Sequence, residues 1–475
     1  MPGPGGRAGA ATTKATSYLS AGVPAGLGIK REWSRMQARR FVDLFAGCGG
    51  LSLGLSLAGM RGVFSIERDD MAFETFSSNF VAETAPDAYR FEWPGWLEQR
   101  AWGIDELLDG HKESLVQLRG KVGVLAGGPP CQGFSFAGRR AEDDPRNLLF
   151  EKYVEVVEAI QPDALILENV PGMRVAHKPS NVVDLPGVPT ARRQSFYEKL
   201  VAKLQKAGYE VEARLIDASQ FGVPQRRSRL IAIGIRKDLV KWLDKGVDRL
   251  FELLEEARVQ QLKDLGLGAQ VSADEAISDL AVAGRPLVEC IDPDSRGGFL
   301  EATRGEATST YQRLMRSGAE APPNSMRLAR HRDDVRERFA RILAECRRGV
   351  RMDDAARKGY GLKKHRIYPM SPSDPAPTIT TLPDDVLHYS EPRILTVRES
   401  ARLQSFPDWF QFRGKFTTGG DRRTKECPRY TQVGNAVPPY LARAIGVAVG
   451  KALEEIQVTR QVFGPTGKRA AGGAR

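Results

Sequence analysis

The stretch FVDLFAGCGGL, residues 41–51, joins an apolar strand pattern to a glycine-rich turn and then to a helical pattern. Its glycines at 47, 49 and 50 permit a tight turn and let the backbone come close to a nucleotide-like ligand. A purely structural strand-to-helix turn is the alternative explanation for these glycines. The order of strand, turn and helix predicts the first unit of an α/β sheet, with a ligand site where the strand ends.

Short apolar or β-branched runs repeat along the chain and alternate with helical patterns. Together with Phe41–Phe45 they predict a mostly parallel sheet covered by helices. This alternation of strand and helix patterns is lost from about 240 to 375, where Pro, Gly and Arg residues interrupt it. We therefore expect a second, smaller domain there. Helical patterns return at Thr396–Ser405 and Tyr440–Ile456. The five further runs expected to be strands are Val63–Glu67, Val122–Ala126, Ala164–Glu168, Val211–Ile216 and Leu230–Ile235.

The composition sets the class of protein. Seventy Lys and Arg against 59 Asp and Glu give a net charge of +11, which suits a polyanionic partner. No apolar run approaches the roughly 20 residues of a membrane helix, and no signal peptide is evident. We therefore expect a soluble, cytoplasmic protein with no membrane partner. The scattered cysteines contain no C-x-x-C pair, which argues against a disulfide framework or a zinc site: Cys48, Cys131, Cys290, Cys346 and Cys427.

A carboxylate follows the glycine loop at the spacing of a nucleoside-binding site. Glu67 comes 20 residues after Gly47, at the end of the second expected strand, where it can accept hydrogen bonds from both hydroxyls of a ribose. Leu51 and Ser52 stand where a dinucleotide-binding loop would place its third glycine. The missing pyrophosphate fingerprint favours a cofactor such as S-adenosylmethionine over NAD.

The sequence GPPCQGFS, residues 128–135, presents Cys131 in a rigid turn after the strand expected at Val122–Ala126. Pro129 and Pro130 have fixed φ angles and no N–H group, so the loop can become neither helix nor strand. Cys131 is the leading candidate for a nucleophile, and a buried structural cysteine is the alternative. A hydrolase-type cysteine would need a histidine base, and none of the five histidines follows a core strand.

Two more polar groups stand at strand ends. Glu168 and Asn169 end the fourth expected strand, where a carboxyl near a heterocycle can hold or donate a proton; a turn cap is the alternative. Gln225, Arg227 and Arg229 alternate before the last strand and so share a face. Their guanidinium groups suit a phosphate or a base carbonyl, and a solvated edge strand is the alternative. A thiol and a carboxyl on one rim fit conjugate addition to a pyrimidine.

In this order the motifs closely resemble those of the DNA (cytosine-5)-methyltransferases of the bacterial single-chain type. The resemblance covers roughly residues 40–237 and 376–455. Besides the loops already quoted, RILTVRESARLQSFP (393–407) resembles the helix that supports a recognition domain. QVGNAVPP (432–439) resembles the final motif, whose asparagine returns to the cofactor pocket. The adenine-contacting Asp of the family has its nearest match at Asp105.

The resemblance implies a Rossmann-like S-adenosylmethionine-dependent methyltransferase sheet. Its domains would be a catalytic and cofactor-binding domain at 39–238, a target-recognition domain at 239–375 and a supporting helix with the return to the catalytic domain at 376–456. Residues 1–38 and 457–475 are expected to be disordered tails. The implied catalytic residues are Cys131, Glu168 and Arg227, and the implied substrate-binding residues are Pro129, Gln225 and Arg229. The implied contacts of S-adenosyl-L-methionine are Phe45, Gly47, Gly49, Glu67 and Asn435, with no metal ion.

The implied reaction methylates carbon 5 of a cytosine that is flipped out of a specific double-stranded DNA sequence. A cognate restriction endonuclease would be a functional rather than a physical partner of a monomeric, nucleoid-associated enzyme. A transfer-RNA cytosine-5 methyltransferase and a catalytically inactive DNA-binding regulator are the alternatives. In the second domain, a helix is expected with Val335, Phe339, Ile342, Leu343 and Cys346 on one side. Its arginines could lie beside DNA or could be balanced by acidic neighbours.

Overall fold

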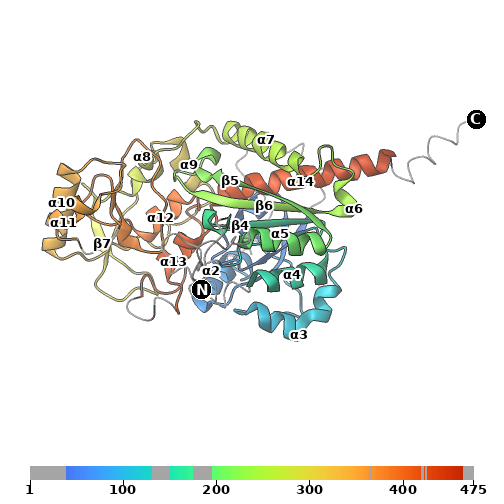
Figure 1. The fold of residues 1–475 in the computed structure, drawn as a ribbon. Helices are drawn as coiled ribbons and strands as arrows, with labels where there is room; N and C mark the ends of the chain where they lie inside the picture. Colours follow the sequence, from blue (N-terminus) through green and yellow to red (C-terminus); the bar gives the residue numbers. More distant parts are fainter. Residues whose placement is uncertain are drawn as a thin grey trace, which may run out of the picture.

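Six strands form the central sheet of the computed structural model (Figure 1), which describes residues 39–130, 149–174, 195–362, 366–418, 422 and 425–463. The strands lie in the order β2-β1-β3-β4-β6-β5. Each overlaps one of the six runs predicted from the sequence, so those predictions are confirmed. The bounds are β1 Arg40–Leu44, β2 Arg61–Ile66, β3 Val124–Gly127, β4 Ala164–Asn169, β5 Tyr209–Asp217 and β6 Ser228–Arg236.

The direction of the strands determines which loops meet. β1 is parallel to β2 and β3, and β3 is parallel to β4, whereas β6 is antiparallel to both β4 and β5. The predicted mostly parallel sheet is therefore confirmed. Because β6 runs in the opposite direction, its amino end lies at the edge where the other strands have their carboxyl ends. Residues just before β6 thus join residues that follow β1, β3 and β4.

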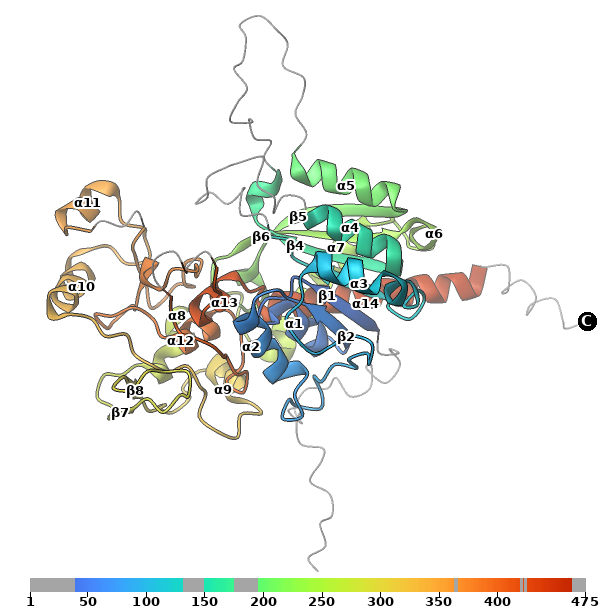
Figure 2. The ribbon, with the colours of Figure 1, turned by 90° about the horizontal axis from the view of Figure 1, so that it is seen from below.

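Different helices cover the two faces of the sheet (Figure 2). Residues two apart along a strand point to the same face, and each fully buried apolar side chain stabilises the fold by about 1.5–3 kcal/mol. Neighbours that divide between the faces in this way include Phe41 and Val42, and Val124 and Leu125. The covering helices are α1 (Gly50–Leu57), α7 (Asp248–Leu265) and α14 (Pro439–Phe463) on one face and α3 (Ile104–Val116), α4 (Leu149–Ile160) and α5 (Phe196–Lys206) on the other.

Helix α1 packs very closely on the start of α14, and a glycine makes this approach possible. A Cβ atom on Gly54 would lie 2.2 Å from the Cβ of Ala442 and 2.6 Å from the carbonyl oxygen of Pro439. Backbone atoms cannot move aside as a flexible side chain can, so any larger residue must push the two helices apart.

Replacing Gly54 with alanine is therefore expected to destabilise the protein by about 1–3 kcal/mol. The matched control is Gly110→Ala in α3, where an added Cβ meets no atom within 4 Å. That change is expected to be neutral or to stabilise by up to ~1 kcal/mol, because alanine favours the helix. Urea unfolding of both variants checks the pair, and a Gly54→Ala protein as stable as the wild type would contradict the packing argument.

The remaining elements are short. In Figure 1 the part of the chain with α10, α11 and β7 lies at the left, at the opposite end of the molecule from α6. The other helices are α2 Asp70–Phe80, α6 Lys237–Val240, α8 Ala273–Ile277, α9 Thr310–Arg316, α10 Asp333–Glu345, α11 Asp354–Gly359, α12 Val397–Leu403 and α13 Arg429–Asn435. The other strands are β7 Leu287–Glu289, β8 Leu300–Ala302, β9 Tyr368–Pro369 and β10 Val386–Leu387. The 3-10 helices are η4 Pro171–Arg174, η5 Ala218–Phe221, η6 Ser278–Leu280 and η7 Pro383–Asp385.

The helix expected in the second domain is confirmed as α10. Phe339, Ile342 and Leu343 are buried in a small separate apolar cluster. On the outer side, Arg338 lies 3.5 Å from Asp334 and Arg341 lies 3.6 Å from Glu345, counted between nitrogen and oxygen atoms. These pairs favour the balanced charged face over a free basic face.

The structure refines the expected division of the chain. Helix α7, which falls in the segment expected to be the second domain, packs against α14 in the same apolar cluster as the sheet. Helix α14 continues to Phe463, so the expectation of a disordered tail from residue 457 is wrong for residues 457–463. The segment at 1–38 and residues 464–475 lie outside the described residues. The boundaries at 238 and 375 remain predictions.

The predicted helix at Thr396–Ser405 is confirmed as α12, and its polar side chains bind the second part of the chain. Arg402 is fully buried and donates to Asp279 at 2.7 Å and to Asp408 at 2.8 Å. Arg398 donates to the carbonyl oxygen of Asn324 at 3.0 Å. Buried guanidinium groups with carboxylate and carbonyl partners hold the segments around 279 and 324 against α12.

Candidate active site

Glu168 and Arg229 meet at the edge of the sheet. Glu168 is near the carboxyl end of β4, and Arg229 is near the amino end of the antiparallel strand β6, so the register brings them together. Arg229 Nε lies 2.7 Å from Glu168 Oε1, and the two side chains are only 11% and 12% exposed. This largely desolvated ion pair fixes the orientation of the carboxylate.

The loop that leads to Cys131 leaves the sheet beside this pair. Asn169 Nδ2 donates to the carbonyl oxygen of Pro129 at 2.9 Å, so β4 holds the start of the loop. A Cβ atom on Gly128 would lie 3.4 Å from Glu168 Oε2, which shows how close the backbone passes to the carboxylate. Cys131 itself lies outside the described residues. The last described residue before it, Pro130, follows directly on this anchored segment.

Three of the described cysteines are poor nucleophiles, because their thiols do not ionise readily. Burial raises the pKa of the Cys48 thiol to about 12 and also raises the pKa of Cys290 and Cys427. In the parts of the chain that the structure describes, no histidine forms a hydrogen bond with a cysteine thiol. This arrangement offers no Cys-His pair of the hydrolase type among those residues.

Gln225 and Arg227 are both buried, and their polar atoms bind the backbone of distant segments. Arg227 donates to the carbonyl oxygens of Ile379 at 3.0 Å and Gly434 at 2.8 Å, while Gln225 accepts from the amide of Ile379 at 2.9 Å. The two side chains therefore hold the segment near 379 and α13 against the catalytic edge. Of the predicted trio, Arg229 contacts Glu168 directly.

The glycine loop and Glu67 form a second polar group at the ends of β1 and β2. The amide of Gly47 donates to Glu67 Oε2 at 3.0 Å, and the amide of Asp69 donates to Oε1 at 2.8 Å. Burial raises the pKa of the Glu67 carboxyl, although both amides favour its charged form. Phe45 and Gly47 both have positive φ angles, of 60° and 56°. A Cβ on Gly47 would meet no atom within 4 Å, so space remains beside the loop.

The predicted final motif lies against this loop. The thiol of Cys48 lies 3.7 Å from the carbonyl oxygen of Gln432, and a Cβ on Gly50 would lie 2.3 Å from the carbonyl oxygen of Val437. Asn435 ends α13 between these contacts, and its side chain is exposed. The structure thus brings residues 47–50, Glu67 and Asn435 into one region, although 385 positions separate Gly50 from Asn435.

The sequence reasoning missed several residues that order this region. Asp69 accepts from the amides of Ala72 and Cys427, each at 3.0 Å, and so caps α2 and fixes the approach to α13. Gln432 accepts from the hydroxyl of Thr75 at 2.7 Å. A cap pattern at Asp69 was visible in the sequence, whereas the contacts across the fold carried no local signal.

Asp43 lies in β1, just before the glycine loop, and the sequence predicted no role for it. Its carboxyl is buried at the end of β1 and accepts from the Ser52 hydroxyl at 2.6 Å. Burial raises its pKa from the ordinary 3.8 to about 7. The folded state therefore binds this proton more tightly than the unfolded chain, and its contribution to stability falls as the pH rises from about 4 to about 7.

Replacing Asp43 with asparagine removes this titration. The stability of the wild type relative to Asp43→Asn is expected to fall as the pH rises from about 4 to about 7, by roughly 3 kcal/mol for a shift of this size. Other titrating groups are common to both proteins and cancel in the difference. Thermal unfolding of the two proteins across this pH range checks the prediction, and a difference independent of pH would contradict it.

Residues 100–105, before and at the start of α3, pass close to Glu67. Trp102 is buried, its amide donates to the carbonyl oxygen of Glu67 at 2.8 Å, and the Arg100 guanidinium lies 3.6 Å from its ring centre. Asp105 is exposed at the start of α3, where its carboxylate lies 3.5 Å from Lys152 Nζ. Asp105 thus pairs with α4, and its adenine contact remains a prediction.

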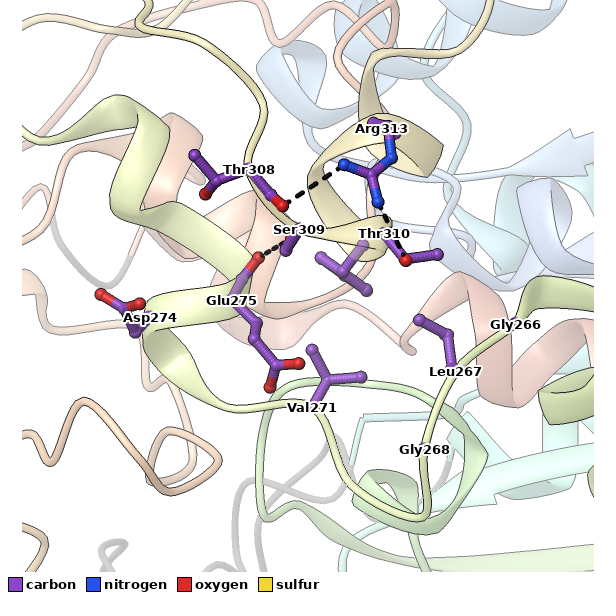
Figure 3. A pocket seen from close by; sticks show the side chains of 11 residues that line it. Gly266, Leu267, Gly268, Val271, Asp274, Glu275, Thr308, Ser309, Thr310 and Arg313 are labelled. Carbon is purple, nitrogen blue, oxygen red and sulfur yellow. Dashed lines mark hydrogen bonds between the residues drawn. The ribbon is translucent and has the colours of Figure 1, made fainter.

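A pocket of about 400 Å³ lies elsewhere, between the end of α7 and the starts of α8 and α9 (Figure 3). Its lining includes Glu275, Ser309 and Arg313 but none of the predicted site residues. Within the described ranges there is no cluster of metal-binding side chains and no helix long and apolar enough to cross a membrane.

Comparisons with known proteins agree with this arrangement. The chain is 30% identical over 429 residues to the type II methyltransferase M.DdeI of Desulfomicrobium norvegicum, covering 88% of this chain and 90% of that protein. It is 31% identical to the type II methyltransferase M1.HphI of Haemophilus parahaemolyticus, covering 86% of each. The crystal structure of a protein described as a DNA modification methyltransferase encoded within an Escherichia coli prophage superposes with a TM-score of 0.55. That comparison has 22% identity and covers 88% of this chain and all of the other, so it supports the fold.

The strongest comparison is with a family as a whole. The sequence profile of the C-5 cytosine-specific DNA methylases matches residues 39–451, which include every described site residue. The match spans the sheet, the second part of the chain and the motif at α13. The chain therefore belongs to the C-5 cytosine-specific DNA methylase family and is a DNA cytosine-5 methyltransferase.

Proposed function

We propose that the enzyme transfers a methyl group from S-adenosylmethionine to carbon 5 of cytosine in a specific double-stranded DNA sequence, through a covalent adduct with Cys131 on a flipped-out base. The observation that carries this proposal is the buried Glu168–Arg229 pair beside the anchored Pro129 carbonyl. The Gly47 and Glu67 region follows neighbouring strands of the same edge. A base and a cofactor could thus be presented to each other.

The residues at β1, β2 and α13 fit a nucleoside cofactor. The Glu67 carboxylate suits the two ribose hydroxyls, the open space beside Gly47 accommodates a flat group, and the exposed Asn435 amide supplies a hydrogen-bonding group. When bound, S-adenosylmethionine supplies a methyl group on a positively charged sulfur. The chain's contribution is to bind and orient it, and the absence of a pyrophosphate-binding glycine pattern supports this choice over NAD.

The remaining residues act on the base. The Cys131 thiolate forms a bond to carbon 6, and the ring electrons move toward carbon 5 while Glu168 hydrogen-bonds or protonates ring nitrogen 3. Carbon 5 then accepts the methyl group, with S-adenosylhomocysteine as the leaving group. Loss of the proton from carbon 5 to a base expels Cys131 and restores the aromatic ring. Arg229 holds the Glu168 carboxylate, and the Pro129 carbonyl could read the exocyclic amine.

Gln225 and Arg227 support this chemistry indirectly. We assign them positioning roles, because their polar atoms bind the backbone near Ile379 and Gly434. The net charge of +11 suits the phosphate backbone of the DNA. We further infer that the protein acts as a monomer on DNA of the nucleoid, with a cognate restriction endonuclease as a functional partner only.

Methyl transfer measured on two nucleic acids tests the proposal. Purified enzyme with tritiated S-adenosylmethionine is expected to label duplex DNA and to leave transfer RNA unlabelled. DNA containing 5-fluorocytosine at the target should trap a covalent adduct, because fluorine cannot leave as a proton does. Labelling of transfer RNA alone would favour the RNA enzyme, and no labelling and no adduct would favour a catalytically inactive DNA-binding regulator. Bisulfite sequencing of DNA from expressing cells then identifies the methylated sequence.

A further inference from the structure

Arg429, the first residue of α13, is fully buried and uses every one of its N–H groups. Its Nε donates to the carbonyl oxygen of Gly414 at 2.9 Å. Its two terminal nitrogens donate to both carboxylate oxygens of Asp292, at 2.5 and 2.8 Å, to the Ser325 hydroxyl at 2.8 Å and to Asp294 at 2.7 Å. A guanidinium group has five N–H donors, so none is left over. Lysine could not reproduce this set of contacts.

The hairpin formed by β7 and β8 is therefore tied to α13. Asp292 and Asp294 lie in its connecting loop, between the two strands. A second tie runs through stacked side chains: the Arg429 guanidinium lies 4.3 Å from the centre of the Phe416 ring, and that of Arg327 lies 3.8 Å from the same centre. Arg327 also stacks on Phe299 of the hairpin at 4.1 Å. Such stacks add to the rigidity of the connection.

The other contacts of this segment lead to the cofactor-binding side chains. Asn435 stands at the opposite end of α13, a helix only about 10 Å long. On the preceding side, the amide of Cys427 donates to Asp69 at 3.0 Å, and the amide of Asp69 donates to Glu67 at 2.8 Å. Residues 427–435 thus link the hairpin to Glu67 through Asp69, and they carry Asn435 at their end.

We propose that Arg429 is a positioning residue through which the β7–β8 hairpin sets the placement of Glu67 and Asn435, and hence the affinity for the cofactor. This inference rests on the proposed function, because it takes these two residues to bind S-adenosylmethionine. Removing the guanidinium fork leaves two like-charged carboxylates, Asp292 at 5% and Asp294 at 29% side-chain exposure, without their cationic partner, so the hairpin loop and the start of α13 are expected to separate. A short helix moves as a unit, and its far end carries Asn435.

The test is binding of S-adenosylhomocysteine to the full chain, measured by isothermal titration calorimetry. Arg429→Lys is expected to raise its Kd roughly three- to thirty-fold, the range for coupling through contacting residues. The KM for S-adenosylmethionine should rise while kcat at saturation changes less. The matched control is Arg398→Lys in α12, another buried arginine, which donates to the carbonyl oxygens of Pro407 and Phe410. It should lower thermal stability similarly and leave the Kd unchanged.

A milder variant guards against simple misfolding. Asp294→Asn changes only the hairpin loop, far along the chain from α13, and should also weaken S-adenosylhomocysteine binding. The double variant with Arg429→Lys should be no weaker than the poorer single variant, since both break the same contact. Wild-type affinity in folded Arg429→Lys or in Asp294→Asn would overturn the inference. A wild-type protein that does not bind S-adenosylhomocysteine would instead overturn the proposed function.

Discussion

Replacing Cys131 with serine is expected to abolish methyl transfer, by at least about 10⁴-fold, while DNA binding persists. The physical reason is the attacking group. A thiol with an ordinary pKa is partly ionised near neutral pH, whereas a serine hydroxyl is not, and oxygen adds poorly to carbon 6 of a pyrimidine. The serine side chain has nearly the same shape, so the loop after Pro130 should still accept the DNA. Tritium transfer and a gel-shift assay on the same duplex measure the two properties.

A second cysteine serves as the control for this change. Cys346 directly follows the last residue of α10, in the second part of the chain. Its thiol lies 3.6 Å from the Tyr360 hydroxyl. Cys346→Ser should therefore retain normal turnover. Trapping on 5-fluorocytosine DNA should be lost only in Cys131→Ser. Full methylation of DNA by the Cys131→Ser protein would show that the thiol is not the nucleophile and would remove the basis of the covalent mechanism.

Replacing Glu168 with glutamine is expected to lower kcat by about 10²–10⁴-fold and to change the KM for DNA little. Glutamine keeps the length of the side chain but can neither donate an acidic proton nor carry a negative charge. It also leaves Arg229, 2.7 Å away and only 11% exposed, without its carboxylate. Single-turnover kinetics with tritiated S-adenosylmethionine separate the chemical step from product release.

A glutamate on the surface provides the comparison. Glu151 in α4 pairs with Lys203 at 2.6 Å and, among the described residues, makes no hydrogen bond or ion pair with a predicted site residue. Glu151→Gln should keep the wild-type kcat, which would show that the loss in Glu168→Gln is local. If Glu168→Gln turned over at the wild-type rate, the carboxyl would have to be a turn cap, the alternative that the sequence left open.

Local patterns in the sequence predicted the strands and therefore the edge at which the site forms. Short apolar or β-branched runs, as at residues 41–45, and glycines after β1 depend on neighbouring residues alone, so they can be recognised from the sequence. The chain order of the motifs then indicated that Glu67, Glu168 and Arg229 follow or precede strands of one sheet. The sequence did not reveal that β6 is antiparallel, which is why Arg229 pairs with Glu168 directly.

The roles of Gln225 and Arg227 depended on contacts that no local pattern records. Alternation placed Gln225, Arg227 and Arg229 on one face, but Arg227 bonds to Gly434, 207 positions later, and becomes buried. Helix α14 likewise extends to Phe463, further than its polar C-terminal sequence suggested.

The sequence by itself determined the α/β fold, the family and the chemical groups of the site. Periodicity and the order of short motifs are properties of the chain. Only the tertiary structure decided which polar side chains face the site and which support it, as for Arg227 and Arg429. The reason is physical: a guanidinium group is stable in the interior only where several acceptors converge, and those acceptors come from distant segments that meet after folding.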